Sequence, residues 1–452
     1  MNRKILALAI PNIISNITVP LLGMVDMALV GHLGKDSLIG AMAIGVAIFN
    51  FIYWNFAFLR MGTSGLVAQA FGARNFREVG SVFVRSVSVA LLAALLLLLF
   101  RQGVGKLAFR MMEGSTETMR AAAEYFYIRL WAAPATLSLF AFQGWFIGMQ
   151  NSRFPMYISI VINLLNVAFG VWFVYGLHWG IAGVAWSTVV AQYGGLLTAS
   201  LLWLIYYRRF IRQVSVREGF DLRPMLRFFR VNRDIFLRTA CIVIVYTFFT
   251  SASSGMGDTI LAINALLMQL FTLFSYMMDG FAFAAESLIG RYVGARNPAM
   301  VQRSLRGLLA WSGGVALLYV GIYALFWEPL LGLFTSSPAI LEGASEYILW
   351  VVAVPLVGFA PFLVDGALIG ATATRVMRNS VFLSMVAFFA VGWSYLDTRG
   401  VDVLFHIAWC SGEQRTMACI YGLFSSARSA PILDDWRVET PVNRLRCVLW
   451  PE

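Results

Sequence analysis

The chain is long, apolar and basic, a combination that excludes most water-soluble proteins. It has 452 residues, of which 60% are hydrophobic and only 13% are charged, and its formal net charge is +11. A soluble domain of this length needs more charged side chains to cover its surface. No nucleic-acid-binding motif accompanies the positive charge. The basic residues are therefore expected at the cytoplasmic face of a membrane rather than at a nucleic-acid site. The composition therefore predicts an all-α polytopic membrane protein.

Six apolar windows in the first half are long enough to cross a bilayer, which takes about 20 residues. They lie at 5–31, 38–71, 79–100, 121–147, 155–176 and 180–206. The first window continues well past the length of a signal-peptide core and has no small-residue cleavage site near its end, so we interpret it as a retained helix. We expect residues 1–206 to form an N-terminal bundle of six transmembrane helices.

A basic segment at 207–238 separates this bundle from the second half. Between Arg223 and Arg230 its arginines and apolar residues recur at helical spacing, which is typical of a helix lying along a membrane surface. We expect a cytoplasmic amphipathic linker here. The second half, 239–396, is expected to form a C-terminal bundle. Its five clear windows lie at 237–257, 259–290, 307–327, 345–370 and 376–396.

The two halves are copies of each other. The tetrapeptide Gly-Ala-Arg-Asn begins at Gly72 and again at Gly294, 222 positions later. An even number of crossings separates the copies, so both halves enter the membrane from the same side as a parallel repeat. Lys and Arg gather in segments such as 208–238 and 291–306, which predicts that these segments and the N-terminus are cytoplasmic. The expected fold is two pseudo-symmetric six-helix bundles.

Residue types that carry catalysis or metal binding are few and scattered. The three histidines are His32, His178 and His406, and neither an HExxH motif nor a phosphate-binding glycine loop is present. The four cysteines form no CxxC pair, so neither a metal site nor a disulfide framework is indicated. We therefore expect no enzyme and no cofactor, apart from a proton or sodium ion as coupling ion.

Asp26 is the leading functional candidate, because an ionisable group inside a membrane helix is energetically expensive. A carboxyl group in a low-dielectric environment favours its neutral form, so it takes up and releases a proton near the working pH. The structural alternative is a carboxylate permanently paired with a cation such as Arg60, or one that caps a broken helix. Arg129 is the other cation in the spans of the first half.

Three acids in the spans of the second half are further candidates. Asp279 and Glu286 lie seven residues apart on one face of a single span, and Asp365 lies two spans later. Their expected role is ion coupling or substrate contact, with structural pairing as the alternative.

Polar and proline residues surround the leading acid in the predicted helices. Asn163, Asn166 and Thr188 are expected either to complete an acceptor network around it or to hydrogen-bond neighbouring helices to one another. Pro11 and Pro20 remove backbone hydrogen bonds in the first helix and make it a candidate hinge, although proline also occurs in straight-packed membrane helices.

Several motifs in order resemble the multidrug and toxic compound extrusion (MATE) family in its DinF-like branch. The resemblance covers about residues 5–395. In the first half it rests on VPLLGMVD at 19–26, VGHLG at 30–34, LRMGTSGL at 59–66 and AQAFGA at 68–73; in the second half on NRDI at 232–235, DGFA at 279–282, DG at 365–366, IGAT at 369–372 and MRNS at 377–380.

This resemblance implies a twelve-helix antiporter that exports cationic or amphipathic organic compounds by alternating access. It implies that Asp26 is the coupling site, that Pro11 marks the bend of the first helix, and that Asn166 and Thr188 are neighbours of the acid. The family often has a second acid on the fifth helix, where this chain has Gly170. That departure favours a single-acid proton mechanism over a two-acid sodium site.

The alternatives are a sodium-coupled exporter of the same family and a lipid-linked oligosaccharide flippase of the same superfamily. In each case the resemblance implies a multi-pass protein of the inner (plasma) membrane, expected to act as a monomer with a cytoplasmic N-terminus and without a nucleic-acid partner.

The segment 397–452 departs from the family pattern. It is charged, rich in cysteine and aperiodic, and its longest uncharged runs, 403–412 and 416–427, are too short to cross a bilayer. We therefore expect the twelfth helix to be missing or replaced.

Overall fold

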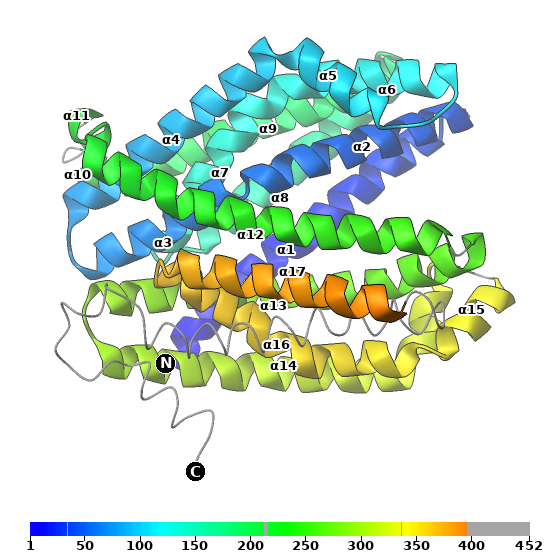
Figure 1. Cartoon of the computed structure of the whole chain (residues 1–452). Helices are drawn as coiled ribbons and strands as arrows, with labels where there is room; N and C mark the ends of the chain where they lie inside the picture. The colour runs from blue at the N-terminus through cyan, green and yellow to red at the C-terminus, as the bar shows by residue number, and fades with distance from the viewer. Residues whose placement is uncertain (34, 212–215, 256, 336, 396–452) are drawn as a thin grey trace. The chain divides into compact units, whose positions relative to one another are not determined.

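The computed structural model describes residues 1–33, 35–211, 216–255, 257–335 and 337–395, and these fold almost entirely into helices (Figure 1). In chain order they are α1 (Asn2–Gly31), α2 (Asp36–Phe56), α3 (Phe58–Gly72), α4 (Phe76–Leu99), α5 (Arg101–Arg110), α6 (Thr116–Arg129), the 3₁₀ turn η1 (Leu130–Ala132), α7 (Ala133–Gly148), α8 (Arg153–Val171), the π turn η2 (Trp172–Gly176), α9 (Gly180–Tyr206), α10 (Arg208–Ile211), α11 (Val216–Gly219), α12 (Leu222–Gly255), α13 (Asp258–Gly294), α14 (Pro298–Gly332), α15 (Pro338–Ser345), α16 (Ile348–Gly370) and α17 (Thr374–Tyr395). Within the described residues, ten helical stretches are long and apolar enough to cross a membrane. The expected all-α membrane fold is confirmed.

The six windows of the first half correspond to six helical stretches. Two of the six stretches are interrupted. The second is broken at Ala57 into α2 and α3, and the fourth consists of α6 and α7 joined by η1. Pro134 lies in the first turn of α7, where its missing N–H costs no intrahelical hydrogen bond.

The windows of the second half correspond to α12, α13, α14, α16 and α17. The first four of these contain spans that are long and apolar enough, whereas α17 is not among the ten. Arg375 and Arg378 lie in the first two turns of α17, so the charged part of the helix takes up a share of its described length. Segment 397–452, where we expected a missing or replaced helix, lies outside the described residues.

The described chain divides into two compact units. One is Ile10–Asn232, and the other combines Met1–Ala9 with the chain from Arg233 onward. The first turns of α1 belong to the second unit because Ile5 packs against Gly307 of α14. The expected linker, 207–238, is not one element: it contains α10, α11 and the first half of α12, which continues without a break to Gly255.

The 222-residue repeat recurs in the backbone of the loops. Arg74 and Arg296 both adopt a left-handed conformation, with φ of 57° and 52°. The next residue in each copy caps the following helix: the side chain of Asn75 accepts from the backbone of Glu78, and that of Asn297 accepts from Met300. Equivalent residues therefore build the same turn in both halves, as the repeated tetrapeptide predicts.

Equivalent glycines also allow equivalent pairs of helices to approach closely. A Cβ atom on Gly144 of α7 would meet the backbone carbonyl of Arg60 in α3, and one on Gly366 of α16 would meet that of Ala282 in α13. These pairs are again 222 positions apart, so α3–α7 and α13–α16 are the same contact in the two copies. Small residues at such crossings let backbones pack at short range inside a membrane.

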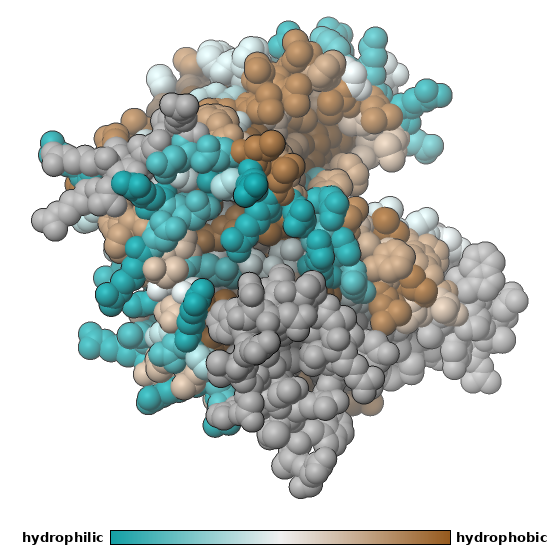
Figure 2. Space-filling model, turned by 60° about the vertical axis from the view of Figure 1, so that its left-hand side comes forward, coloured by the Kyte–Doolittle hydropathy of each residue, from teal (hydrophilic) through white to brown (hydrophobic). Residues whose placement is uncertain are grey.

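Large apolar side chains lie exposed along the long helices. Leu95, Leu99 and Leu325 are 61%, 69% and 75% exposed. In Figure 2 broad apolar areas occupy much of the visible surface of the described residues, and hydrophilic side chains gather toward the left of the view. Extended apolar surface of this kind is typical of a protein whose outer faces contact lipid.

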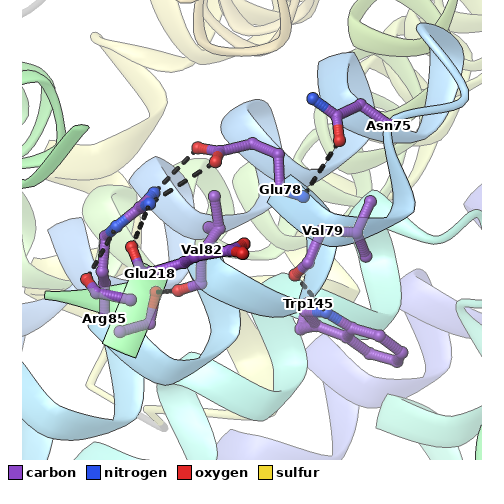
Figure 3. A network of polar contacts seen from close by, with 9 residues as sticks. Asn75, Glu78, Val79, Val82, Arg85, Trp145 and Glu218 are labelled. Carbon is purple, nitrogen blue, oxygen red and sulfur yellow. Dashed lines mark hydrogen bonds and ion pairs between the residues drawn. The ribbon is translucent and has the colours of Figure 1, made fainter. Parts of the chain in front are cut away.

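A buried arginine fastens the start of the inter-half segment to the first unit (Figure 3). Arg85 of α4, which is 2% exposed, forms an ion pair with Glu78 at 2.8 Å. Its Nε donates to the carbonyl of Gly219 at 2.9 Å and its Nη2 to that of Glu218 at 3.2 Å. The guanidinium thus adds a charged donor to carbonyl groups at the C-terminal end of α11, of which that of Glu218 also accepts from the backbone of Asp221 at 3.4 Å.

We expect Arg85→Gln to release α11 from α4. Hydrogen bonds from a charged donor contribute about 2 kcal/mol, which corresponds to a roughly 30-fold larger population of the open segment. Limited trypsinolysis within 208–223 should accelerate accordingly. Arg77→Gln removes an exposed arginine from the same helix and serves as the matched control. Equal cleavage of the Arg85 variant and the native protein would show that α11 is held by other contacts.

Candidate functional site

Asp26 lies in the last two turns of α1 and is buried, with 4% of its surface exposed. The adjoining residues Leu29 and Val30 belong to an apolar cluster that also contains Phe49 of α2 and Tyr125 of α6. The carboxyl group is therefore held where α1 packs against apolar side chains of other helices, and water reaches little of it. Ionising it there has a high cost in free energy.

Asn166 and Thr188 meet beside this acid. Asn166 of α8 is fully buried and donates from Nδ2 to Oγ1 of Thr188 in α9, at 3.1 Å. The Asn166 side chain also lies against the Asp26 carboxyl group. Among the described residues, Oδ1 of Asp26 and Oδ1 of Asn166 are both buried and have no hydrogen-bond donor. Two acceptor oxygens without a donor form a site suited to an added proton.

Asn163, the third predicted member of the network, contacts α1 at a different level. Its Nδ2 donates to the backbone carbonyl of Thr18 at 3.1 Å, two turns before the acid. Two of the three predicted residues are thus brought together at Asp26, while Asn163 hydrogen-bonds α8 to the middle of α1.

Gly170 lies where a second acid would be expected from the family pattern. A Cβ atom added there would lie 2.8 Å from Cδ1 of Leu29, which fills the space in front of α8. A longer side chain would fit only if Leu29 moved. The packing therefore provides one acid at this site rather than two.

Arg129, not Arg60, is the cation that acts on Asp26. The guanidinium of Arg129, at the end of α6, interacts electrostatically with the carboxyl group. Arg60 lies on α3 and is almost buried there. Both arginines were candidates from the sequence and Arg60 was the expected example of a partner, because nothing in the order of the helices shows which one faces α1.

The equivalent position in the second half carries no acid. Residues 222 positions after Asp26 and Asn166 are Phe248 and Phe388. Their rings lie 5.9 Å apart, edge to face, within a small apolar cluster. The same pair of helix positions is therefore in contact in both copies, polar in the first and aromatic in the second. The repeat retained the contact and kept the ionisable group in one half.

Asp365 is paired with a cation in the structure. Its carboxylate forms an ion pair with Arg238 of α12. This contact agrees with the structural alternative considered for this residue. Arg238 lies at the end of the expected linker, 127 positions before Asp365, so the sequence gives no sign that the two side chains meet.

Asp234 is a buried acid outside the set predicted from the sequence. It is fully buried at the start of the second unit, where Arg378 of α17 donates to its Oδ1 at 2.8 Å and Thr374 donates to its Oδ2 at 3.3 Å. It falls within 207–238, the stretch expected to form a cytoplasmic amphipathic linker, so no buried acid was predicted there.

The Asp234 contact is the charged version of a neutral contact in the first half. Residues 222 positions earlier are Asn12 and Ser152, which hydrogen-bond to each other at 3.0 Å. Both copies therefore fasten their first helix to the turn between the fourth and fifth helices. An acid at this place contributes to the fold, which argues for a structural role of Asp234.

The remaining second-half acids lie on α13. Glu286 is buried, and its backbone carbonyl faces Gly370 at the close approach of α13 to α16. Asp279 lies two turns earlier, is partly buried, and interacts with Tyr276. Of the three predicted acids of this half, Glu286 therefore lies at the contact of α13 with α16, Asp365 forms the ion pair with Arg238, and Asp279 lies near Tyr276.

Both predicted hinge prolines lie inside α1, which remains helical from Asn2 to Gly31. Pro11 is buried. It lies two positions after Ala9, where the part of α1 that belongs to the second unit ends. Its carbonyl accepts a hydrogen bond from Ser15 Oγ at 3.1 Å. The proline that interrupts the hydrogen-bond ladder therefore lies where α1 leaves one compact unit and enters the other.

Comparison with known proteins identifies the family. A family model described as MatE matches residues 11–172 and again 235–394. DNA damage-inducible protein F of Escherichia coli (strain K12) is 37% identical over 386 residues, covering 84% of this chain and 83% of that protein. The Arabidopsis thaliana protein DETOXIFICATION 44, chloroplastic, is 26% identical over 395 residues, covering 82% of this chain and 72% of the relative.

A solved structure has the same fold. The crystal structure of MATE in the bent conformation superposes with a TM-score of 0.86 at 19% identity, covering 94% of this chain and 95% of that chain. The double match of the family model repeats the duplication seen in the loops and the glycine contacts. The chain is therefore a transporter that belongs to the MatE family of multidrug and toxic compound extrusion proteins, in the branch of DNA damage-inducible protein F.

Proposed function

We propose that this transporter is a proton-coupled antiporter that exports cationic or amphipathic organic compounds by alternating access, with Asp26 as the coupling acid. The observation that carries the proposal is the pair of buried oxygens on Asp26 and Asn166, neither of which has a donor among the described residues. A proton on the carboxyl group converts one of its oxygens from an acceptor into a donor, beside the Asn166 side chain that lies against it.

Two features support a proton rather than a sodium ion. A hard cation is held by several oxygen ligands, usually including more than one charged group. Asp26 is the one acid at this site, since Gly170 takes the second position, and no group of three or more possible metal-ligating acids, histidines or cysteines occurs among the described residues. Arg129 also provides a positive charge next to the carboxylate, which opposes the binding of a second cation.

We also propose which membrane holds the protein and on which side its N-terminus lies. The exporter lies in the inner (plasma) membrane as a monomer, with its N-terminus in the cytoplasm. The excess of Lys and Arg in the segments expected at the cytoplasmic face supports this orientation.

Ion dependence in reconstituted vesicles tests the proposal. Purified protein in liposomes containing a fluorescent cationic dye is given either a pH gradient or a sodium gradient at constant pH. We expect dye movement against its gradient with the pH gradient alone. Sodium-driven movement at constant pH would favour the sodium-coupled alternative, and no dye movement under either gradient would contradict export of such compounds.

A further inference from the structure

Arg129 is a partly buried cation near Asp26, and the proposed coupling scheme gives it no part in the movement of the proton. It is the last residue of α6, one turn after Tyr125, and lies beside the apolar cluster formed by α1, α2 and α6. An arginine at such a depth needs compensation, because transfer of its charge from water into an apolar environment is unfavourable. The nature of that compensation determines what the residue can do.

The guanidinium is held by aromatic side chains rather than by the acid. Its Nη1 donates to the hydroxyl of Tyr125 at 2.6 Å. Its central carbon lies 4.8 Å from the ring centre of Phe49 and 5.5 Å from that of Tyr125. Positive charge over an aromatic face is stabilised by the ring quadrupole, most strongly where water is excluded.

Asp26 and Arg129 lie at the same apolar cluster. Leu29 and Val30, one turn after Asp26, belong to the cluster that contains Phe49 and Tyr125, the two rings that hold the guanidinium. The charged atoms of Asp26 and Arg129 form no ion pair among the contacts of the described residues, although their electrostatic interaction is mutual. The other titratable groups that act on Arg129 are the phenols of Tyr53 on α2 and Tyr125 on α6. Neutralising Asp26 therefore leaves the contacts of the guanidinium with Phe49 and Tyr125 in place.

We infer that Arg129 is a fixed positive charge, held by Phe49 and Tyr125, that sets the pH at which Asp26 releases its proton. This inference rests on the proposed function. Arg129 is a positioning residue: it touches neither proton nor substrate in this scheme, and acts by favouring the ionised form of a nearby carboxyl group. Its aromatic contacts keep it in place in both protonation states of the acid, so the charge of the site alternates between zero and one positive unit.

The pH profile of transport tests the inference. In Arg129→Gln the ionised form of Asp26 loses a favourable interaction, so the pH of half-maximal proton-driven dye efflux should rise by about one unit or more. Arg129→Lys keeps the charge and should restore most of the native midpoint. Arg101→Gln is the matched control, because Arg101 also lies over an aromatic ring, 5.7 Å from Trp131, and does not act on Asp26.

A structural role would give a different result. If Arg129 merely braced the helices, Arg129→Gln would lower the maximal rate and the unfolding temperature at an unchanged midpoint, and this outcome would overturn the inference. If Arg129→Gln does not fold, the pH midpoint of efflux is measured instead in Arg129→Lys and in Tyr125→Phe. The second of these variants retains the ring but not the hydroxyl. In Arg129→Lys we expect most of the native pH midpoint of efflux. A midpoint displaced upward in that variant would show that the positive charge by itself does not set it.

Infrared titration separates this inference from the proposed function. The C=O band of a protonated carboxyl group that disappears in Asp26→Asn reports the proton on Asp26 without any transport. We expect the midpoint of this band to move to higher pH in Arg129→Gln. A band that moves while transport of the native protein proves independent of pH would refute proton coupling and support Arg129. If the midpoint of the band stays at the same pH in Arg129→Gln, the role of Arg129 is refuted and proton coupling is not.

Discussion

Asp26→Asn is expected to abolish pH-gradient-driven efflux, reducing it to the level of vesicles without protein. Asparagine has nearly the shape of a protonated aspartic acid but neither gains nor loses a proton. Because the native carboxyl group is buried and its Oδ1 lacks a donor, the neutral amide should not weaken the fold. The measurement is dye efflux from proteoliposomes together with the unfolding temperature of the same preparation.

Two further variants make this result specific. Asp26→Glu retains a titratable acid and should keep part of the activity. Asp221→Asn removes an exposed acid near the start of α12 and should have no effect. Full proton-driven efflux by Asp26→Asn would exclude this residue as the coupling site.

Gly366→Ala is expected to prevent normal packing of the second unit. The added methyl group would meet the carbonyl oxygen of Ala282 and would lie 2.8 Å from its carbonyl carbon, so α13 and α16 have to separate. Forcing an extra methyl group into a packed contact costs about 1–3 kcal/mol, and more where the obstacle is backbone. We expect a low yield of monodisperse protein and a reduced unfolding temperature.

The matched control is a glycine in a similar helix that faces open space. A Cβ atom on Gly321, inside α14, would meet nothing within 4 Å. Gly321→Ala should therefore be neutral or stabilising, since alanine is the better helix former by about 1 kcal/mol. Equal stability of Gly366→Ala and Gly321→Ala would show that the close approach of α13 and α16 is not required.

Equivalent positions in the two copies carry different chemistry. The pair Asp26 and Asn166 has become Phe248 and Phe388, whereas the neutral pair Asn12 and Ser152 corresponds to Asp234 and Thr374. Equivalent positions remain in contact, so the backbone constrains which residues meet. The chemistry at those positions diverged between the copies, and a search for acids in the sequence alone does not distinguish a coupling acid from a structural one.

Part of the candidate site was predictable from the sequence. Asp26 is conspicuous because a charge inside an apolar helix is rare, and Asn166 and Thr188 matched the family pattern. Asn163 lies on the same helix as Asn166 but bonds α1 at Thr18, two turns before the acid, because residues three positions apart share a helix face at different heights along the axis. Sequence position by itself did not resolve which of the two faces the acid.

The sequence by itself determined the class, the repeat and the long apolar helices. These depend on local composition, on runs of about 20 apolar residues and on a constant offset between copies, all of which can be counted along the chain. The tertiary structure alone decided the partners of the charges: Arg129 rather than Arg60 for Asp26, and Arg238 for Asp365. A helix presents its side chains in all directions, and the neighbour that each one meets is set by the packing of helices distant in sequence.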